Sequence, residues 1–155
     1  MSVERGDFAS VVLDGKIYAM GGFRGGYFLD RVERYDPQAD SWQRVASMPR
    51  RLAGHAAAVM GGKIYVTGGE TDQGSSVNSV YVYDPQADAW AQLASMGIAR
   101  RDHASAVVGG KLYVFGGSDD SGHLSTAEVY DPASDSWAQV TSLTSARRVF
   151  VAAAL

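Results

Sequence analysis

The sequence has no cysteine among its 155 residues. This absence excludes disulfide bonds, thiolate metal sites and a cysteine nucleophile, and it leaves the redox environment open. Basic residues are not in excess either, because 14 lysines and arginines stand against 17 aspartates and glutamates, for a net charge of −3. A broad basic surface for nucleic acid or for an anionic membrane is therefore not expected.

Long apolar runs and helical periodicity are also missing. No stretch approaches the ~18 apolar residues that span a bilayer, and the first residues lack the apolar core of a signal peptide. We therefore expect a soluble protein with no membrane partner, and the cytoplasm is the default location. Since no segment places apolar residues at helical spacing, we predict an all-β protein.

Glycine, by contrast, is abundant, with 18 residues, and three pairs of glycines each close a similar segment. These segments are DGKIYAMGG, GGKIYVTGG and GGKLYVFGG, at residues 14–22, 61–69 and 109–117. Each is followed by a second shared segment, YDPQADSW, YDPQADAW or YDPASDSW, at residues 35–42, 83–90 and 130–137. Both segments recur every 47 or 48 residues, a period typical of propellers, solenoids and other arrays.

Each repeat is predicted to hold four strands. In the second repeat they lie at residues 54–60, 63–67, 80–83 and 89–93. The second strand of a repeat is apolar on both faces, so it needs a packed layer on each side. We therefore predict a β-propeller with one antiparallel four-stranded blade per repeat. The blades are residues 5–50, 51–98 and 99–146 of a single unit, 1–155.

These motifs resemble the kelch repeat, in which paired glycines are followed by a tyrosine and then a tryptophan. The resemblance covers nearly the whole chain and implies that twelve residues are structural. They are Gly21, Gly22, Gly68, Gly69, Gly116, Gly117, Tyr35, Tyr83, Tyr130, Trp42, Trp90 and Trp137. The glycines would close the second strand where a side chain would collide with the neighbouring blade, and the aromatic residues would pack between blades. A phosphate-binding loop would instead need a helix after the glycines, and none is predicted.

Propellers have about 4–8 blades, whereas this chain has three repeats. Residues 147–155 resemble a fourth copy of the first strand. We therefore expect a homodimer in which two chains form a six-bladed ring, with 147–155 as an extra inner strand for ring closure. The N-terminal strand, 7–13, competes for the same place. The alternative is a fragment, or an engineered half-propeller whose main property is self-assembly.

Binding is predicted at the loop end of the propeller. The first loop between second and third strands carries Phe23, Arg24 and Tyr27, and aromatic residues and arginine are frequent in binding hot spots. Resemblance to kelch substrate adaptors also implies that arginines at the start of the first strand ring the channel mouth and bind an acidic peptide or protein. They are Arg5, Arg100 and Arg147. The alternatives are that these arginines pair within the blades or remain solvated, and that the aromatic residues pack on a neighbouring blade.

The sequence favours a non-catalytic scaffold, with no catalytic residue, no cofactor and no metal. His55 and His103 occupy equivalent positions near the axis, but Phe8 and Phe150 interrupt a ring of imidazoles. The alternative is a carbohydrate-modifying enzyme that resembles the sialic acid epimerase class of kelch proteins. Its polar residues would be Glu70, Arg24 and Arg100, brought together from separate loops.

Overall fold

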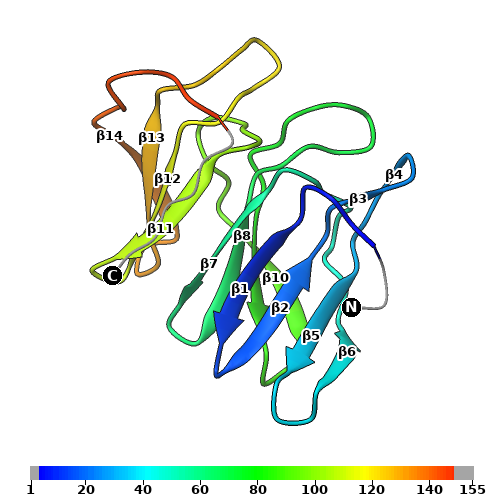
Figure 1. Ribbon diagram of the computed structural model, residues 1–155. Helices are drawn as coiled ribbons and strands as arrows, with labels where there is room; N and C mark the ends of the chain where they lie inside the picture. The colour runs from blue at the N-terminus through cyan, green and yellow to red at the C-terminus, as the bar shows by residue number, and fades with distance from the viewer. Residues whose placement is uncertain (1–3, 149–155) are drawn as a thin grey trace.

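Three four-stranded antiparallel sheets stand side by side in the computed structural model, which describes residues 4–148 (Figure 1). The first sheet has the order β1 (Ala9–Leu13), β2 (Lys16–Met20), β5 (Val32–Asp36), β6 (Ser41–Val45). The second comprises β7 (Ala56–Met60), β8 (Lys63–Thr67), β9 (Val80–Asp84) and β10 (Ala89–Leu93). The third comprises β11 (Ala104–Val108), β12 (Lys111–Phe115), β13 (Ala127–Asp131) and β14 (Ser136–Val140). The described residues contain no helix, so the predicted all-β class is confirmed.

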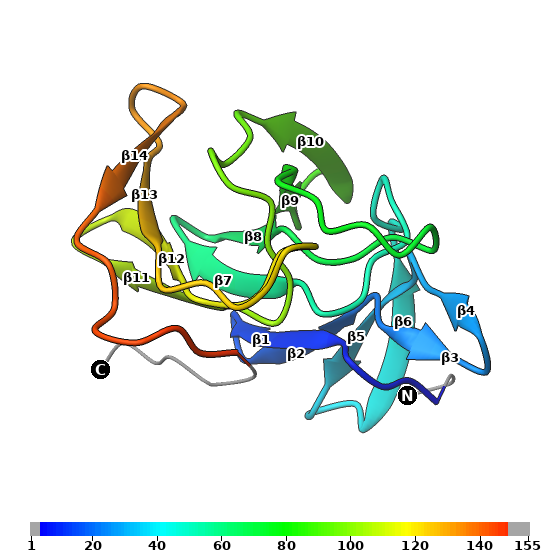
Figure 2. The same ribbon diagram turned by 90° about the horizontal axis from the view of Figure 1, so that it is seen from above.

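The sheets are arranged as blades, with the first strand of each sheet toward a common centre. The innermost strands β1, β7 and β11 contact one another in sequence, and β6, β10 and β14 lie on the outside (Figure 2). Strands alternate in direction, so the β1–β2 type hairpins gather at one end of the blades. The long loops and the connections between blades gather at the other end, which we call the loop face (Figure 1).

The central strands explain why the blades must pack together. In β8, Ile64 and Val66 are fully buried on one face, while Tyr65 and Thr67 are buried on the other. A strand that is buried on both faces requires a layer of side chains on each side. The neighbouring blades supply these layers, as Tyr18 of β2 does when its ring packs 6.0 Å from that of Tyr83 in β9.

The glycine pairs close the central strands where two blades approach each other. Gly68 has φ +59°, and a Cβ atom there would lie 2.3 Å from the carbonyl oxygen of Arg100, in the connection to the next blade. Gly69 faces its own blade, since a Cβ there would lie 2.9 Å from the Cβ of His55. Only glycine combines this backbone conformation with so close an approach.

The loop after β2 is more regular than expected. It contains a short hairpin, β3 (Phe23–Arg24) and β4 (Tyr27–Phe28), which turns at Gly25 and Gly26. Both glycines have positive φ, of 54° and 93°, as two-residue hairpin turns require. Gly6 and Phe23 exchange backbone hydrogen bonds of 2.9 and 2.8 Å, which fix this hairpin to the segment that precedes β1.

The expected closing strand at 147–155 falls mostly outside the described residues, and only Arg147 and Arg148 belong to the structure. The backbone of Arg147 continues the repeat. Its carbonyl accepts a hydrogen bond from Gly117 N–H at 2.8 Å. The carbonyl of Arg100 accepts from Gly69 N–H in the same way at 2.8 Å. Arg147 therefore occupies the position at which each repeat starts.

We expect Gly68→Ala to destabilise the fold more than Gly61→Ala. Gly61 has φ +58°, nearly the same as Gly68, but no atom lies within 4 Å of its added Cβ. Both changes carry the left-handed backbone cost of about 1–2 kcal/mol, whereas Gly68→Ala adds a steric cost of about 1–3 kcal/mol. Urea unfolding of the two variants measures the difference, and equal losses would contradict the proposed close approach of the blades.

Candidate functional site

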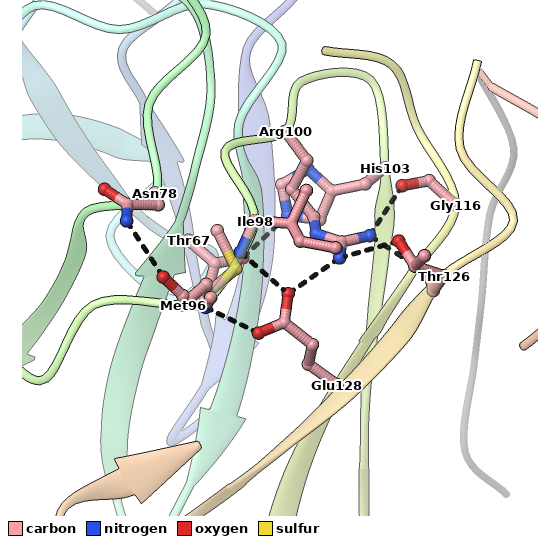
Figure 3. Close-up of polar contacts among 10 residues, drawn as sticks. Thr67, Asn78, Met96, Ile98, Arg100, His103, Gly116, Thr126 and Glu128 are labelled. Carbon is pink, nitrogen blue, oxygen red and sulfur yellow. Dashed lines mark hydrogen bonds and ion pairs between the residues drawn. The ribbon is translucent and has the colours of Figure 1, made fainter. Parts of the chain in front are cut away.

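The arginine at the start of the third repeat lies inside the protein. The Arg100 side chain has no exposed surface, and its Nη2 lies 2.8 Å from Oε1 of Glu128 on β13. Its Nη1 donates hydrogen bonds to the carbonyl oxygens of Gly116, at 2.8 Å, and Thr126, at 3.1 Å (Figure 3). The guanidinium group thus holds the loop between β12 and β13 closed.

The carboxylate of Glu128 has partners on both oxygens. Besides Arg100, it accepts hydrogen bonds from the backbone N–H groups of Gly97, at 2.6 Å, and Ile98, at 3.2 Å (Figure 3). These two residues lie in the connection between the second and third blades. The buried ion pair therefore joins the third blade to the chain that precedes it.

Arg5 is buried in the same way in the first blade. Its Nη2 lies 2.6 Å from Oε2 of Glu33, and its Nη1 donates to the carbonyl oxygens of Gly21 and Arg31 at 2.9 Å. The predicted role of Arg5 and Arg100 in binding an acidic ligand is therefore wrong. Neither guanidinium reaches the channel mouth, and moving one outward would leave a buried carboxylate without its partner. Arg147 is exposed and donates a hydrogen bond to Ser145 Oγ at 3.0 Å.

The second blade has an apolar pair at these positions. Leu52 stands where the other repeats have arginine, Tyr81 stands where they have glutamate, and both are buried. Pro49, which has no N–H group, stands where Gly97 donates to Glu128. All three positions have changed together, so the ion pair and the apolar pair are alternative solutions for the same space.

We expect Arg100→Leu to destabilise the protein by roughly 3–5 kcal/mol, because it leaves the Glu128 carboxylate buried without its partner. The double variant Arg100→Leu, Glu128→Tyr copies the second blade and should recover at least half of that loss. Gly97 is exposed, so water can accept its released N–H. Thermal and urea unfolding provide the test, and a double variant no more stable than Arg100→Leu would contradict the equivalence of the two pairs.

His55 and His103 lie beside the buried arginines. Nε2 of His103 lies 2.9 Å from Oγ1 of Thr67 in the second blade. Burial, with the charge of Arg5, lowers the pKa of His55 to about 4. Burial, with the charge of Arg100, lowers the pKa of His103 to about 3. Both imidazoles are therefore neutral near pH 7, and among residues 4–148 no group of three histidine, aspartate or glutamate side chains could hold a metal ion.

These two histidines predict a loss of stability in mild acid. The unfolded chain takes up a proton at each histidine near pH 6.5, whereas the folded chain does not until about pH 4 and pH 3. Above pH 6.5 these histidines do not lower the free energy of unfolding. Below that pH the free energy of unfolding falls, by about 1.4 kcal/mol per pH unit for each histidine.

Urea unfolding between pH 7 and pH 5 measures this slope. The variant His55→Phe, His103→Phe places in both repeats the phenylalanine that Phe8 supplies in the first, and its slope should be shallower. Equal slopes in the two proteins would contradict this assignment.

The loop face carries the exposed aromatic residues. Tyr27 is 72% exposed and Phe23 is 38% exposed, and Arg24 between them is also exposed. The rings of Phe23 and Phe28 meet edge to face with centroids 5.6 Å apart, so the β3–β4 hairpin presents a firm aromatic surface. The structure thus brings together three of the predicted binding residues, Phe23, Arg24 and Tyr27, on one hairpin.

A cavity of about 340 Å³ lies next to this hairpin. It is lined by Asp7, Phe23, Phe28, Ala53, Gly54, Glu70 and Asp102. Asp7, Gly54 and Asp102 occupy one repeat position, and all three have positive φ, between 50° and 60°. Backbone hydrogen bonds join them, from Gly54 N–H to Asp7 O at 2.9 Å and from Asp102 N–H to Gly54 O at 2.7 Å. The pocket is therefore acidic and aromatic, and backbone hydrogen bonds connect the three blades along one of its walls.

Arg101 organises the other side of the loop face. Its Nη1 lies 3.2 Å from Asp120 Oδ1 and 3.6 Å from Glu70 Oε1, and it donates to Ser76 Oγ at 3.0 Å. It thereby joins the loops of the second and third blades. Sequence reasoning missed Arg101 because the kelch pattern that drew attention to Arg100 does not include the next position.

Sequence reasoning also missed the two pocket aspartates, whose only signal was their shared repeat position with Gly54. The polar residues considered for an enzyme do not converge. Arg100 is enclosed with Glu128, and Glu70 pairs with Arg101.

Comparison with protein families identifies the class of the protein. Residues 46–154 match the KLHDC2/KLHL20/DRC7 Kelch-repeats domain, and residues 4–49 match the Kelch motif. The first match alone covers more than half of the chain, so the chain belongs to the kelch-repeat family, as its glycine, tyrosine and tryptophan motifs indicated.

Relatives and a solved structure agree with this class. The chain is 42% identical over 69 residues to human Kelch-like protein 33 and 44% identical over 69 residues to zebrafish Kelch-like protein 26. Each match covers 44% of this chain but only 13% and 11% of the relatives. The solved structure of YjhT superposes with a TM-score of 0.82 at 20% identity, over 91% of this chain and 53% of that one. This likeness supports the kelch propeller fold.

None of residues 4–148 forms a helix that could span a membrane.

Proposed function

We propose that this chain is a non-catalytic kelch scaffold that binds a protein partner at its loop face. The observation that carries the proposal is the β3–β4 hairpin, whose Phe23 lines a cavity and whose Tyr27 is the most exposed aromatic residue of this hairpin. Large aromatic side chains next to a pocket are the usual centre of a protein interface. The loops that differ among the three repeats lie at this same end (Figure 1), and loops on a rigid scaffold commonly carry binding.

The charge of the pocket indicates the chemistry of the partner. Asp7, Glu70 and Asp102 line it together with the rings of Phe23 and Phe28. Carboxylates beside aromatic faces attract a lysine or arginine side chain, through ion pairs and cation–π contacts. Arg101 neutralises part of the charge of Glu70, so Asp7 and Asp102 carry most of the attraction. The site therefore favours a basic residue at the centre of the partner segment.

Two of the predicted binding residues are exposed arginines, and of these only Arg147 was expected to bind an acidic ligand. Arg24 lies on the hairpin and Arg147 lies after the third blade. Either one suits a carboxylate at the edge of the partner segment.

We also propose that two chains complete the propeller as a homodimer. The chain spans 53% of the YjhT chain, so two copies have about the length of that propeller.

A displayed library of random peptides tests the loop-face site. Peptides selected on the wild-type chain should contain lysine or arginine, and their dissociation constants are then measured by fluorescence anisotropy. Asp7→Asn, Asp102→Asn should weaken these peptides about tenfold, the equivalent of one ion pair or charged hydrogen bond. Asparagine tolerates the positive φ of both positions, so the backbone is preserved. Tyr27→Ser should weaken binding by a similar factor.

Asp14→Asn is the matched control. Asp14 is exposed and has φ +50°, like Asp7, but it lies in the β1–β2 hairpin at the opposite end of the blade. It should leave binding unchanged. Peptides that bind the Asp7→Asn, Asp102→Asn variant and the Tyr27→Ser variant as tightly as they bind the wild-type chain would contradict the proposed site.

A further inference from the structure

The junction between the first and second blades is built around one alanine. Ala46, just after β6, donates its N–H to Oδ1 of Asp88 at 2.8 Å, and its carbonyl accepts the indole N–H of Trp90 at 2.9 Å. The hydroxyl of Tyr83 holds the same carboxylate, at 2.7 Å. We call Tyr83, Asp88 and Trp90 a junction triad, because together they bind both backbone groups of a residue in the preceding blade.

The junction between the second and third blades repeats this arrangement. Ala94 N–H donates to Asp135 Oδ1 at 3.0 Å, and Trp137 Nε1 donates to Ala94 O at 2.9 Å. The hydroxyl of Tyr130 holds Asp135 at 2.8 Å. The junction triad is therefore a fixed device of this chain, and its ligand is the backbone of the residue after the outer strand of a blade.

The first blade has a complete junction triad whose ligand is missing. Tyr35 donates to Asp40 Oδ1 at 2.6 Å, and the ring of Trp42 lies 5.2 Å from that of Tyr35 at a tilt of 39°. The second blade has nearly the same geometry, with 5.1 Å and 39° between Tyr83 and Trp90. However, within residues 4–148 no backbone N–H is bound to Asp40, and no acceptor is bound to the indole of Trp42.

The other half of a junction lies at the opposite end of the chain. Thr141 follows β14 as Ala46 follows β6 and Ala94 follows β10. It is exposed, and neither its N–H nor its carbonyl forms a hydrogen bond with any residue of the described range 4–148. Within residues 4–148, the third blade therefore ends on a backbone residue with no triad partner, and the first blade has a triad with no backbone partner.

The apolar surfaces of the two end blades match in the same way. Ile17 on β2 is 39% exposed, whereas its equivalents Ile64 and Leu112 are fully buried. At the other end, Tyr113 on β12 is only half-buried. Its equivalents Tyr18 and Tyr65 pack against the tyrosine of the next junction triad, at 6.0 and 6.2 Å between ring centroids.

We propose that a second copy of this chain occupies the open face of the first blade, through its own third blade. Thr141 of the second copy donates its N–H to Asp40 and accepts the indole N–H of Trp42, while its Tyr113 packs on Tyr35. This contact between two chains has the same hydrogen bonds and ring packing as the two junctions between blades within one chain. It rests on the proposed homodimer, for which it names the interface. Because the two faces are different, a ring of two chains uses this head-to-tail contact twice.

The mass in solution and one pair of matched variants test this interface. Light scattering of the wild-type chain should give twice the 16.5 kDa of a single chain. Trp42→Phe keeps the ring but removes one hydrogen bond from each of two contacts, so it should raise the dissociation constant about tenfold per contact, or about a hundredfold. Trp90→Phe removes the equivalent bond inside the chain. It should lower the melting temperature and leave the dissociation constant unchanged.

Indole N–H signals in a nitrogen–proton correlation spectrum distinguish this interface from any other dimer. The Trp42 signal, assigned with Trp42→Phe, should shift and become protected from solvent exchange as the protein concentration rises. The signals of Trp90 and Trp137 should be protected throughout. A mass of one chain at every concentration would overturn the proposal, as would a dimer with an unprotected Trp42 indole. Peptide binding at the loop face is read separately, so the two proposals can fail independently.

Discussion

Each blade of this protein is a single sheet that must be covered on both faces, and this requirement shapes everything else. A four-stranded sheet has no second layer of its own, so Ile64 and Val66 on one face of β8 and Tyr65 and Thr67 on the other are buried only because a blade stands on each side. Glycine closes the central strand because the neighbouring backbone passes where a side chain would begin. The junction triads then fix the distance and the angle between blades with hydrogen bonds to a single backbone residue.

Charge is used inside the blades as well as on their surface. Two of the three blades bury an arginine with a glutamate, and the other fills the same space with leucine and tyrosine. A buried ion pair is an uncertain source of stability, because desolvation offsets the attraction. What Arg100 and Glu128 supply is a set of directed hydrogen bonds, to Gly116, Thr126, Gly97 and Ile98, which fix loops that have no regular structure of their own.

The loop face is different because its side chains are not required for packing. Phe23, Arg24 and Tyr27 are exposed on a hairpin whose backbone is tied to Gly6. Arg101 joins the loops of the other two blades through Asp120 and Ser76. The result is a firm rim with varied chemistry on a repetitive framework, which is the arrangement expected of a binding protein.

Much of the fold could be predicted from the sequence, because the determinants are local and are repeated three times. Glycine pairs, the tyrosine–tryptophan segment and the period of 47 or 48 residues indicated the strands, the turns and the number of blades. The expected strands at 63–67 and 89–93 agree with β8 and β10. The short β3–β4 hairpin was missed, because the segment after the second strand was expected to be a loop and the Gly25-Gly26 pair was not used as a turn signal.

The candidate site depended on the tertiary structure. Arg5 and Arg100 look like surface arginines in the sequence, and only the positions of Glu33 and Glu128, 28 residues further along the chain, make them internal. Asp102, in the third blade, reaches the pocket beside the β3–β4 hairpin of the first blade only after the blades have packed. The sequence by itself determined the blade, since strand and turn preferences act over a few residues. The folded structure decided which charges are buried and which faces are left open, because those depend on contacts between residues distant in the chain.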